Sequence, residues 1–127
     1  MSTEKWTPSP ELDKAVGDAI GLNVIVEPLP KLGPDAKHVV MNDESGTPWM
    51  PSVYLMDAFF AAESVCPDGF AIHRPHASQV EQHELWHAVV GKGWDQLRGR
   101  AVRIFEARGA TPALAICRAI MLMVGNE

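Results

Sequence analysis

The segment from Leu114 to Val124 most restricts how this chain can fold, because Arg118 is its only charged residue. A helix that is apolar on nearly every side must be packed deep inside the protein. Thr111 and Pro112 precede the segment, and a threonine cap followed by proline at the first helical position is a typical helix start. We therefore predict a closing helix that forms the main core element. Its buried residues are expected to include Ile116, Cys117 and Ile120.

Length, charge and hydropathy exclude several classes of protein. The 127 residues, 46% of them apolar, suit a single domain over residues 1–127, with residues 1–8 as a loose tail. The net charge of −5 argues against a nucleic-acid partner, because phosphate binding needs clustered lysine and arginine. The longest apolar run, Pro112–Val124, is too short to cross a bilayer core of about 30 Å. We expect neither nucleic acid nor membrane as a partner.

The cysteines and the N-terminus indicate the compartment. The two cysteines, Cys66 and Cys117, lie far apart with no CxxC spacing, so neither a disulfide framework nor a zinc knuckle is expected. Met1–Pro10 is polar and lacks the apolar stretch of a signal peptide. These features predict a protein of a reducing cytoplasm.

Hydrophobic spacing and turn residues predict an α+β fold. Ser9 and Pro10 are expected to start the first helix, and Gly21 to end it. A hairpin turn is expected at Gly91-Lys92-Gly93-Trp94. A second helix is predicted over Ser52–Val65, with Leu55 among the positions expected to face inward. The strands predicted from local sequence are Leu22–Glu27, Lys37–Met41, Phe70–Arg74 and Ala101–Ala107.

One short motif has a recognisable chemistry. His83, Glu84 and His87 form an HExxH pattern, which on a helix would place both histidines on one face to share a zinc ion. In a strand the same histidines would lie about 13 Å apart, too far to share one metal. No third ligand follows at a recognisable spacing. Ser78 and Glu81 can form a capping box and Gly91 can end a helix, so the residues alone leave His83–Val90 open between helix and strand. We predict no metal or cofactor, and a small zinc-dependent hydrolase is the alternative.

Three stretches of the chain form a recognisable set: Glu11-Leu12-Asp13-Lys14-Ala15-Val16, Trp49-Met50-Pro51, and Thr111-Pro112-Ala113-Leu114-Ala115-Ile116-Cys117-Arg118-Ala119. In these stretches the sequence resembles the phage ABA-sandwich family, small proteins of phages and prophages. The stretches occur in the family's order along nearly the whole chain. Tyr54-Leu55-Met56-Asp57 departs from the Ser-Thr-Asp helix start that the family often shows.

The resemblance implies a layered α-β-α sandwich with a mainly antiparallel five-stranded sheet, in the order α-β-β-α-β-β-β-α. It also implies a Trp-centred strand over Glu84–Val89, which is why the HExxH segment is predicted to be extended. The family brings no established activity and therefore no catalytic residues.

The preferred functional class is a non-enzymatic binding or host-modulating accessory protein of a phage or prophage, acting in the host cytoplasm. Recognition would fall to loops, because helices cover the sheet faces. Trp49 lies in a turn-rich loop, and Arg74 and His76 flank Pro75. We predict that Trp49, Arg74 and His76 meet an unknown protein or small ligand. Trp49 closing the core under its loop is the alternative.

Overall fold

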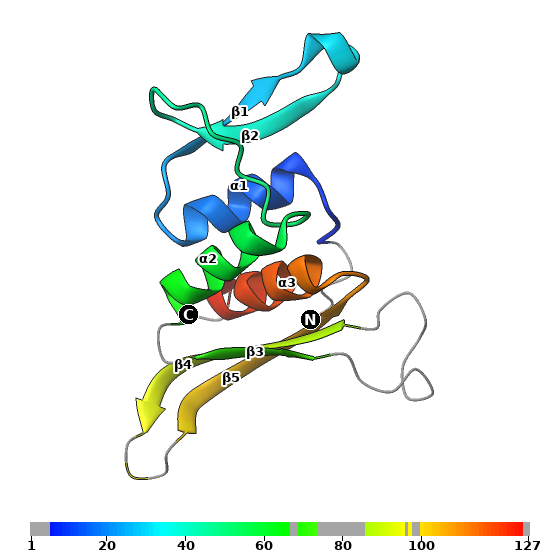
Figure 1. Ribbon diagram of the computed structural model, residues 1–127. Coiled ribbons are helices and arrows are strands. Elements are labelled where there is room, and N and C mark those ends of the chain that lie inside the picture. The colour runs from blue at the N-terminus through cyan, green and yellow to red at the C-terminus, as the bar shows by residue number, and fades with distance from the viewer. Residues whose placement is uncertain (1–5, 67–68, 74–85, 96, 98–99, 126–127) are drawn as a thin grey trace.

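Within the described residues, three α-helices lie between two antiparallel sheets (Figure 1). The computed structural model describes residues 6–66, 69–73, 86–95, 97 and 100–125. Its elements are α1 (Pro10–Ala19), β1 (Val24–Pro28), a 3-10 turn η1 (Pro30–Leu32), β2 (Lys37–Met41), α2 (Leu55–Val65), β3 (Phe70–His73), β4 (Trp86–Asp95), β5 (Arg100–Gly109) and α3 (Pro112–Gly125). The α+β class and the predicted order of helices and strands are confirmed.

The predicted five-stranded sheet is wrong. β1 and β2 form one two-stranded sheet, and β3, β4 and β5 form a separate three-stranded sheet. α1 packs on the first sheet and α3 on the second, so the helices form the middle layer rather than the outer ones (Figure 1). A period-two pattern predicts a strand and its two faces, but not the strand it pairs with. The division into two sheets therefore could not be read from local sequence.

The predicted hairpin turn at Gly91–Trp94 is also wrong. β4 continues through it to Asp95, and Lys92 and Trp94 pair with Arg103 and Ala101 of β5. A Gly-x-Gly sequence is compatible with a turn. Glycine is also tolerated inside a strand, where it contributes no side chain to the packing.

The two predicted helix caps are present. The backbone N–H of Leu12 donates to the Ser9 hydroxyl over 3.1 Å, with Pro10 opening α1. The backbone N–H of Leu114 donates to the Thr111 hydroxyl, also over 3.1 Å, at the start of α3. Each cap satisfies an amide that the first helical turn leaves without a partner. Both helices therefore begin where the sequence predicts.

α3 is the centre of the core, as predicted. Residues 113–120 are all buried, and Ile116, Cys117 and Ile120 are each 0% exposed. Burial raises the pKa of the Cys117 thiol and keeps it a small apolar side chain. The buried Arg118 donates from Nε to the carbonyl of Trp6 and from Nη1 to the carbonyl of Arg108, each over 2.8 Å. These hydrogen bonds of the Arg118 side chain link α3 to the N-terminal segment and to the end of β5.

α2 begins at Leu55, three residues later than the predicted Ser52. Ser52 is instead held in a turn, where its backbone N–H donates to the Asp13 carboxylate over 2.8 Å. The fully buried positions of α2 are the alanines 58, 61 and 62, and Phe59 and Val65 pack against the core while staying partly exposed.

Asp13 is a buried carboxylate whose pKa is raised, mainly by desolvation, although its hydrogen bond from Ser52 acts in the opposite direction. Because the folded state holds this proton more tightly than the unfolded state, the contribution of Asp13 to stability falls as the pH rises through its titration. Asp13→Asn keeps an oxygen acceptor and removes the buried charge. We expect this variant to be more stable than the wild type at pH 7 and no more stable in acid, measured by urea unfolding across pH.

Asp13→Ala is the matched control, because it removes the charge and the acceptor together. The backbone N–H of Ser52 is then left buried without its partner, and we expect a loss of about 1–3 kcal/mol at pH 7. Equal stabilities of the asparagine and alanine variants at pH 7 would contradict a structural role for the Asp13–Ser52 hydrogen bond.

Candidate functional site

A pocket of about 380 Å³ opens between α2 and the segment that runs from the end of β2 to Trp49. We call it the α2 pocket. Most of its lining is apolar, and thioether and aromatic side chains dominate it. Its lining residues are Met41, Thr47, Pro48, Trp49, Met56, Asp57, Phe59, Phe60 and Glu63. Ligand pockets in proteins commonly occupy about 300–1,000 Å³, so the volume suits a ligand or an inserted side chain.

Trp49 forms the base of this pocket and is only 2% exposed. Its indole Nε1–H donates to the backbone carbonyl of Asp13 in α1 over 3.0 Å. Its ring meets the edge of Phe60 from α2, with centroids 6.0 Å apart at 82°. Trp49 is therefore buried, which fits the alternative that it closes the core under its loop. That it also meets a partner stays a prediction.

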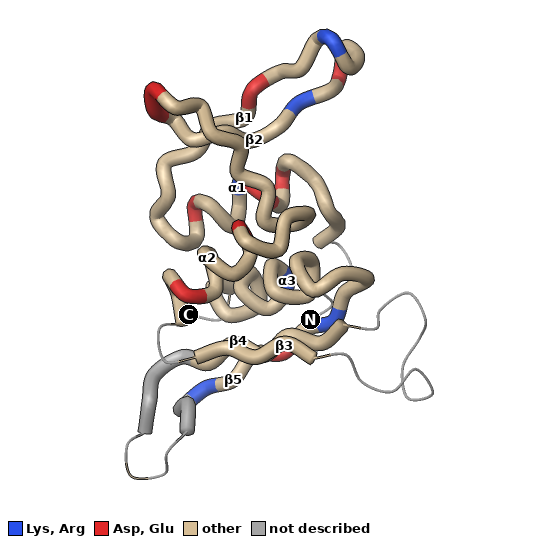
Figure 2. The backbone as a smooth tube through the Cα atoms, viewed as in Figure 1, with Lys and Arg blue, Asp and Glu red and all other residues tan. Residues whose placement is uncertain are grey.

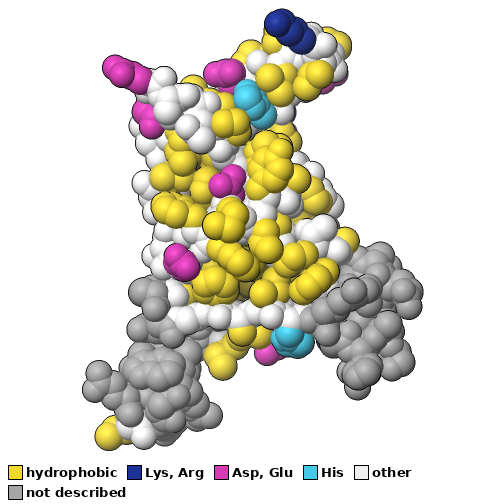
Figure 3. All heavy atoms as spheres, in the orientation of Figure 1, with side chains coloured by type: hydrophobic (Ala, Val, Ile, Leu, Met, Phe, Trp, Pro, Cys, Tyr) yellow, Lys and Arg dark blue, Asp and Glu magenta, His cyan; other side chains and the backbone are white. Residues whose placement is uncertain are grey.

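Large apolar side chains stay exposed around the pocket mouth. Met56 is 77% exposed and Phe60 51% exposed, one helical turn apart on α2. Val53 and Tyr54, just before the helix, are also more than half exposed. In Figure 3 apolar side chains form a broad area across this middle region of the molecule. Leu55, expected to face inward, is 37% exposed instead.

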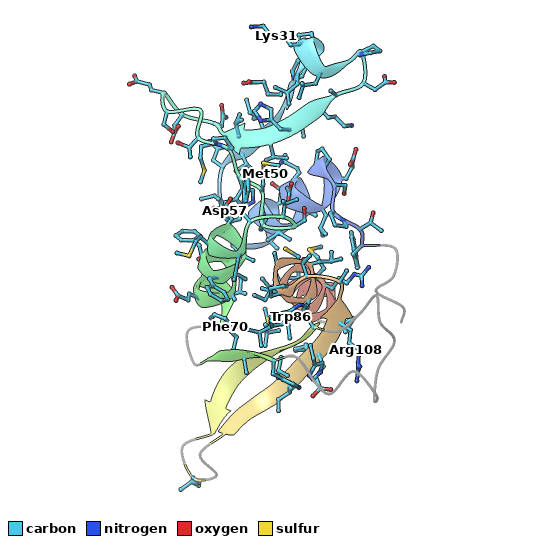
Figure 4. The ribbon with its side chains drawn as sticks, turned by 45° about the vertical axis from the view of Figure 1, so that its right-hand side comes forward. Lys31, Met50, Asp57, Phe70, Trp86 and Arg108 are labelled. Carbon is cyan, nitrogen blue, oxygen red and sulfur yellow. The ribbon has the colours of Figure 1, made fainter. Side chains whose placement is uncertain are left out.

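The charged residues of the pocket are acidic. Asp57 and Glu63 both line it, and no lysine, arginine or histidine is among the lining residues that the structure describes. Figure 2 shows acidic positions on α2, which carries no basic residue along its length. One oxygen of Asp57 accepts from the backbone N–H of Met50 over 2.9 Å, and these two residues lie close together in Figure 4. That hydrogen bond holds the pocket segment against the start of α2.

The other residues of the predicted site, Arg74 and His76, lie outside the described residues. The prediction that they act together with Trp49 therefore stays a prediction. Sequence analysis missed Met56, Phe60 and Glu63. The alanines at 58, 61 and 62 were the available signal, because a helix that packs through alanines turns its larger apolar side chains elsewhere.

The HExxH segment is described only from Trp86 onward, and His83 and Glu84 lie outside the described residues. Trp86–Val90 belongs to β4 and is extended, as predicted. His87 therefore lies on a strand, and the helical zinc geometry that the hydrolase alternative requires of it is absent.

His87 instead faces a histidine of the neighbouring strand. The ring atoms His87 Nδ1 and His73 Nε2 are 3.2 Å apart, and His87 Nε2 lies 3.8 Å from a carboxylate oxygen of Glu106 on β5. Burial lowers the pKa of His87, Glu106 opposes that shift, and His73 and Arg108 add to it. The neutral imidazole is thus the favoured form at neutral pH.

In the part of the chain that the structure describes, no three histidine, cysteine, aspartate or glutamate side chains gather as a ligand set for a metal ion. No helix there has the length and apolar character needed to cross a membrane. No protein-family model matches the chain, and comparisons with curated proteins and with solved structures find no significant match.

Proposed function

We propose that the protein is a non-enzymatic binding module, and that a partner polypeptide inserts an apolar side chain and a neighbouring lysine or arginine at the α2 pocket. The observation that carries this proposal is an apolar pocket whose charged lining, among the described residues, consists of Asp57 and Glu63.

The apolar part of the surface supports a protein partner. Met56 and Phe60 leave most of their side chains in water beside the pocket, although burial of such a side chain contributes about 1.5–3 kcal/mol. Contiguous exposed apolar side chains often mark protein–protein contact sites. Methionine also adapts its shape to a partner, which suits Met56 at the mouth of the pocket.

The charge of the pocket favours a basic partner segment. A lysine or arginine at the mouth would meet the Glu63 carboxylate, and the half-exposed ring of Phe60 offers a face for a cation–π contact. The net charge of −5 adds a long-range attraction for a basic partner. An acidic partner would be repelled both by the carboxylates of the pocket and by the net charge of the protein.

The resemblance to the phage ABA-sandwich family supports a phage or prophage accessory role, with a bacterial host protein as the partner and the host cytoplasm as the place of action. The zinc-dependent hydrolase is not proposed, because His87 lies on a strand.

Peptide selection on the immobilised full chain tests the proposal. We expect a random peptide library to yield sequences that combine an aromatic or aliphatic residue with a lysine or arginine. In titrations of an enriched peptide, Met56→Ala should weaken binding about tenfold, the equivalent of 1.4 kcal/mol. Glu63→Gln should weaken it less and reduce its dependence on salt, because exposed charges are screened.

Leu32→Ala is the matched control, since Leu32 is 75% exposed and lies in η1, away from the pocket lining. It should bind the enriched peptide as the wild type does. Equal binding by Met56→Ala, or equal affinity for a version of the peptide with glutamate in place of its basic residue, would overturn the proposal.

A further inference from the structure

The outer face of the three-stranded sheet carries a second cluster of side chains, away from the α2 pocket. Ala88 and Val90 of β4 are buried toward α3, so His87 and Val89 point to the opposite face. Figure 3 shows histidine and acidic side chains next to each other beneath this sheet. The cluster consists of His73, His87 and Glu106.

We propose that His73 and His87 form a two-histidine site for a divalent transition metal such as Zn²⁺, Ni²⁺ or Cu²⁺, with water in the remaining coordination positions. Imidazole nitrogen is a preferred ligand of these three ions. The site takes one ligand from β3 and one from β4.

The strand register places the two ligands. His73 and His87 are direct partners in the β3–β4 ladder, so their side chains project from the same face of the sheet. Their facing nitrogens, Nε2 of His73 and Nδ1 of His87, are 3.2 Å apart. Two nitrogens that bind one tetrahedral zinc ion at about 2.0–2.1 Å are separated by about 3.3 Å. The observed spacing is that of a hydrogen bond between the two rings, and it is also close to that of two ligands of a single ion.

Glu106 lies beside the His87 ring. It pairs with Val89, and its carboxylate lies 3.8 Å from Nε2 of His87, the ring nitrogen that does not face His73. In the tautomer that carries its hydrogen on Nε2, Nδ1 keeps the lone pair with which it can bind a metal. A carboxylate behind a histidine ligand is a common support of metal sites.

Among the described residues, one cation lies beside the cluster. Arg108 is the ladder partner of His87 on β5, and it is the charged group there that opposes a bound metal ion. Its side chain is exposed, so water and salt weaken its repulsion. Figure 4 shows Arg108 at the end of the sheet near Trp86.

Calorimetric titration of the untagged, metal-free full chain with zinc, nickel or copper tests the site. We expect one equivalent of at least one ion to bind with a dissociation constant in the micromolar range. His73→Ala and His87→Ala should each weaken binding at least about tenfold, and Glu106→Gln about tenfold. In NMR spectra, the imidazole resonances of His73 and His87 should be the ones that shift with the ion.

His38→Ala is the matched control. His38 also contacts a carboxylate, with its Nε2 3.3 Å from Glu27, but it belongs to the other sheet. This variant should bind the metal as the wild type does. The proposal is overturned if none of the three ions binds below about 1 mM, or if both His73→Ala and His87→Ala retain wild-type affinity. Neither result depends on whether the α2 pocket binds a peptide.

Discussion

Replacing Trp49 with alanine is expected to lower the free energy of unfolding by about 3–5 kcal/mol, the usual cost of removing a fully packed tryptophan. Three contacts support this expectation. The indole donates to the carbonyl of Asp13, stacks edge-on against Phe60, and lies so close to α1 that a Cβ added to Gly17 would be 3.1 Å from Nε1. Small domains are stable by only about 5–15 kcal/mol, so the loss is a large share of the total. Urea unfolding followed by circular dichroism measures it.

Trp49→Phe separates the two parts of this loss. Phenylalanine retains most of the apolar contact and loses the hydrogen bond to Asp13, so its destabilisation should be smaller than that of alanine. A cost below about 1 kcal/mol for Trp49→Ala would contradict a buried ring, since only surface substitutions are that mild.

The features that local sequence predicted well depend on nearby residues. Ser9 and Thr111 cap helices through amides three residues away, and the bounds of β2, Lys37–Met41, were predicted without error. The apolar run around Ile120 predicted its burial, because a helix with one charge has no face suited to water.

The features that the sequence could not predict depend on pairing between residues that are far apart in the chain. Whether β2 joins β3 in one sheet is decided by the helices that pack between them, and no local pattern encodes it. The same holds for the histidine pair, since His73 and His87 meet through strand register alone. The HExxH pattern indicated His83 as the partner of His87, because that pattern reflects only the spacing of residues on a helix.

The α2 pocket is another feature that local sequence could not predict. Local sequence predicted a helix, but Phe60 and Met56 look like core residues until the packing is known. Because α2 meets α3 through alanines, its larger side chains are not needed for that contact and remain at the surface. The distance between the axes of two packed helices depends on the size of the side chains at their contact. Sequence periodicity does not report this tertiary feature and therefore could not predict the site.

Ile120→Ala is expected to cost about 2–5 kcal/mol of unfolding free energy, because Ile120 is 0% exposed in the helix that contacts both other helices and the three-stranded sheet. The upper part of this range applies when the neighbouring residues cannot move in to fill the cavity that the substitution leaves. α3 is held at its start by Thr111 and along its length by Arg118, so it has little freedom to move inward. We therefore expect a loss of at least about 3 kcal/mol.

Ile104→Ala is the matched control, with the same atoms removed from a side chain that is 55% exposed on β5. It should cost less than about 1 kcal/mol, since it leaves no closed cavity behind. Both variants are compared by urea unfolding at one pH, with equal slopes confirming that the same transition is measured. Equal losses for the two isoleucines would show that α3 is not the centre of the core.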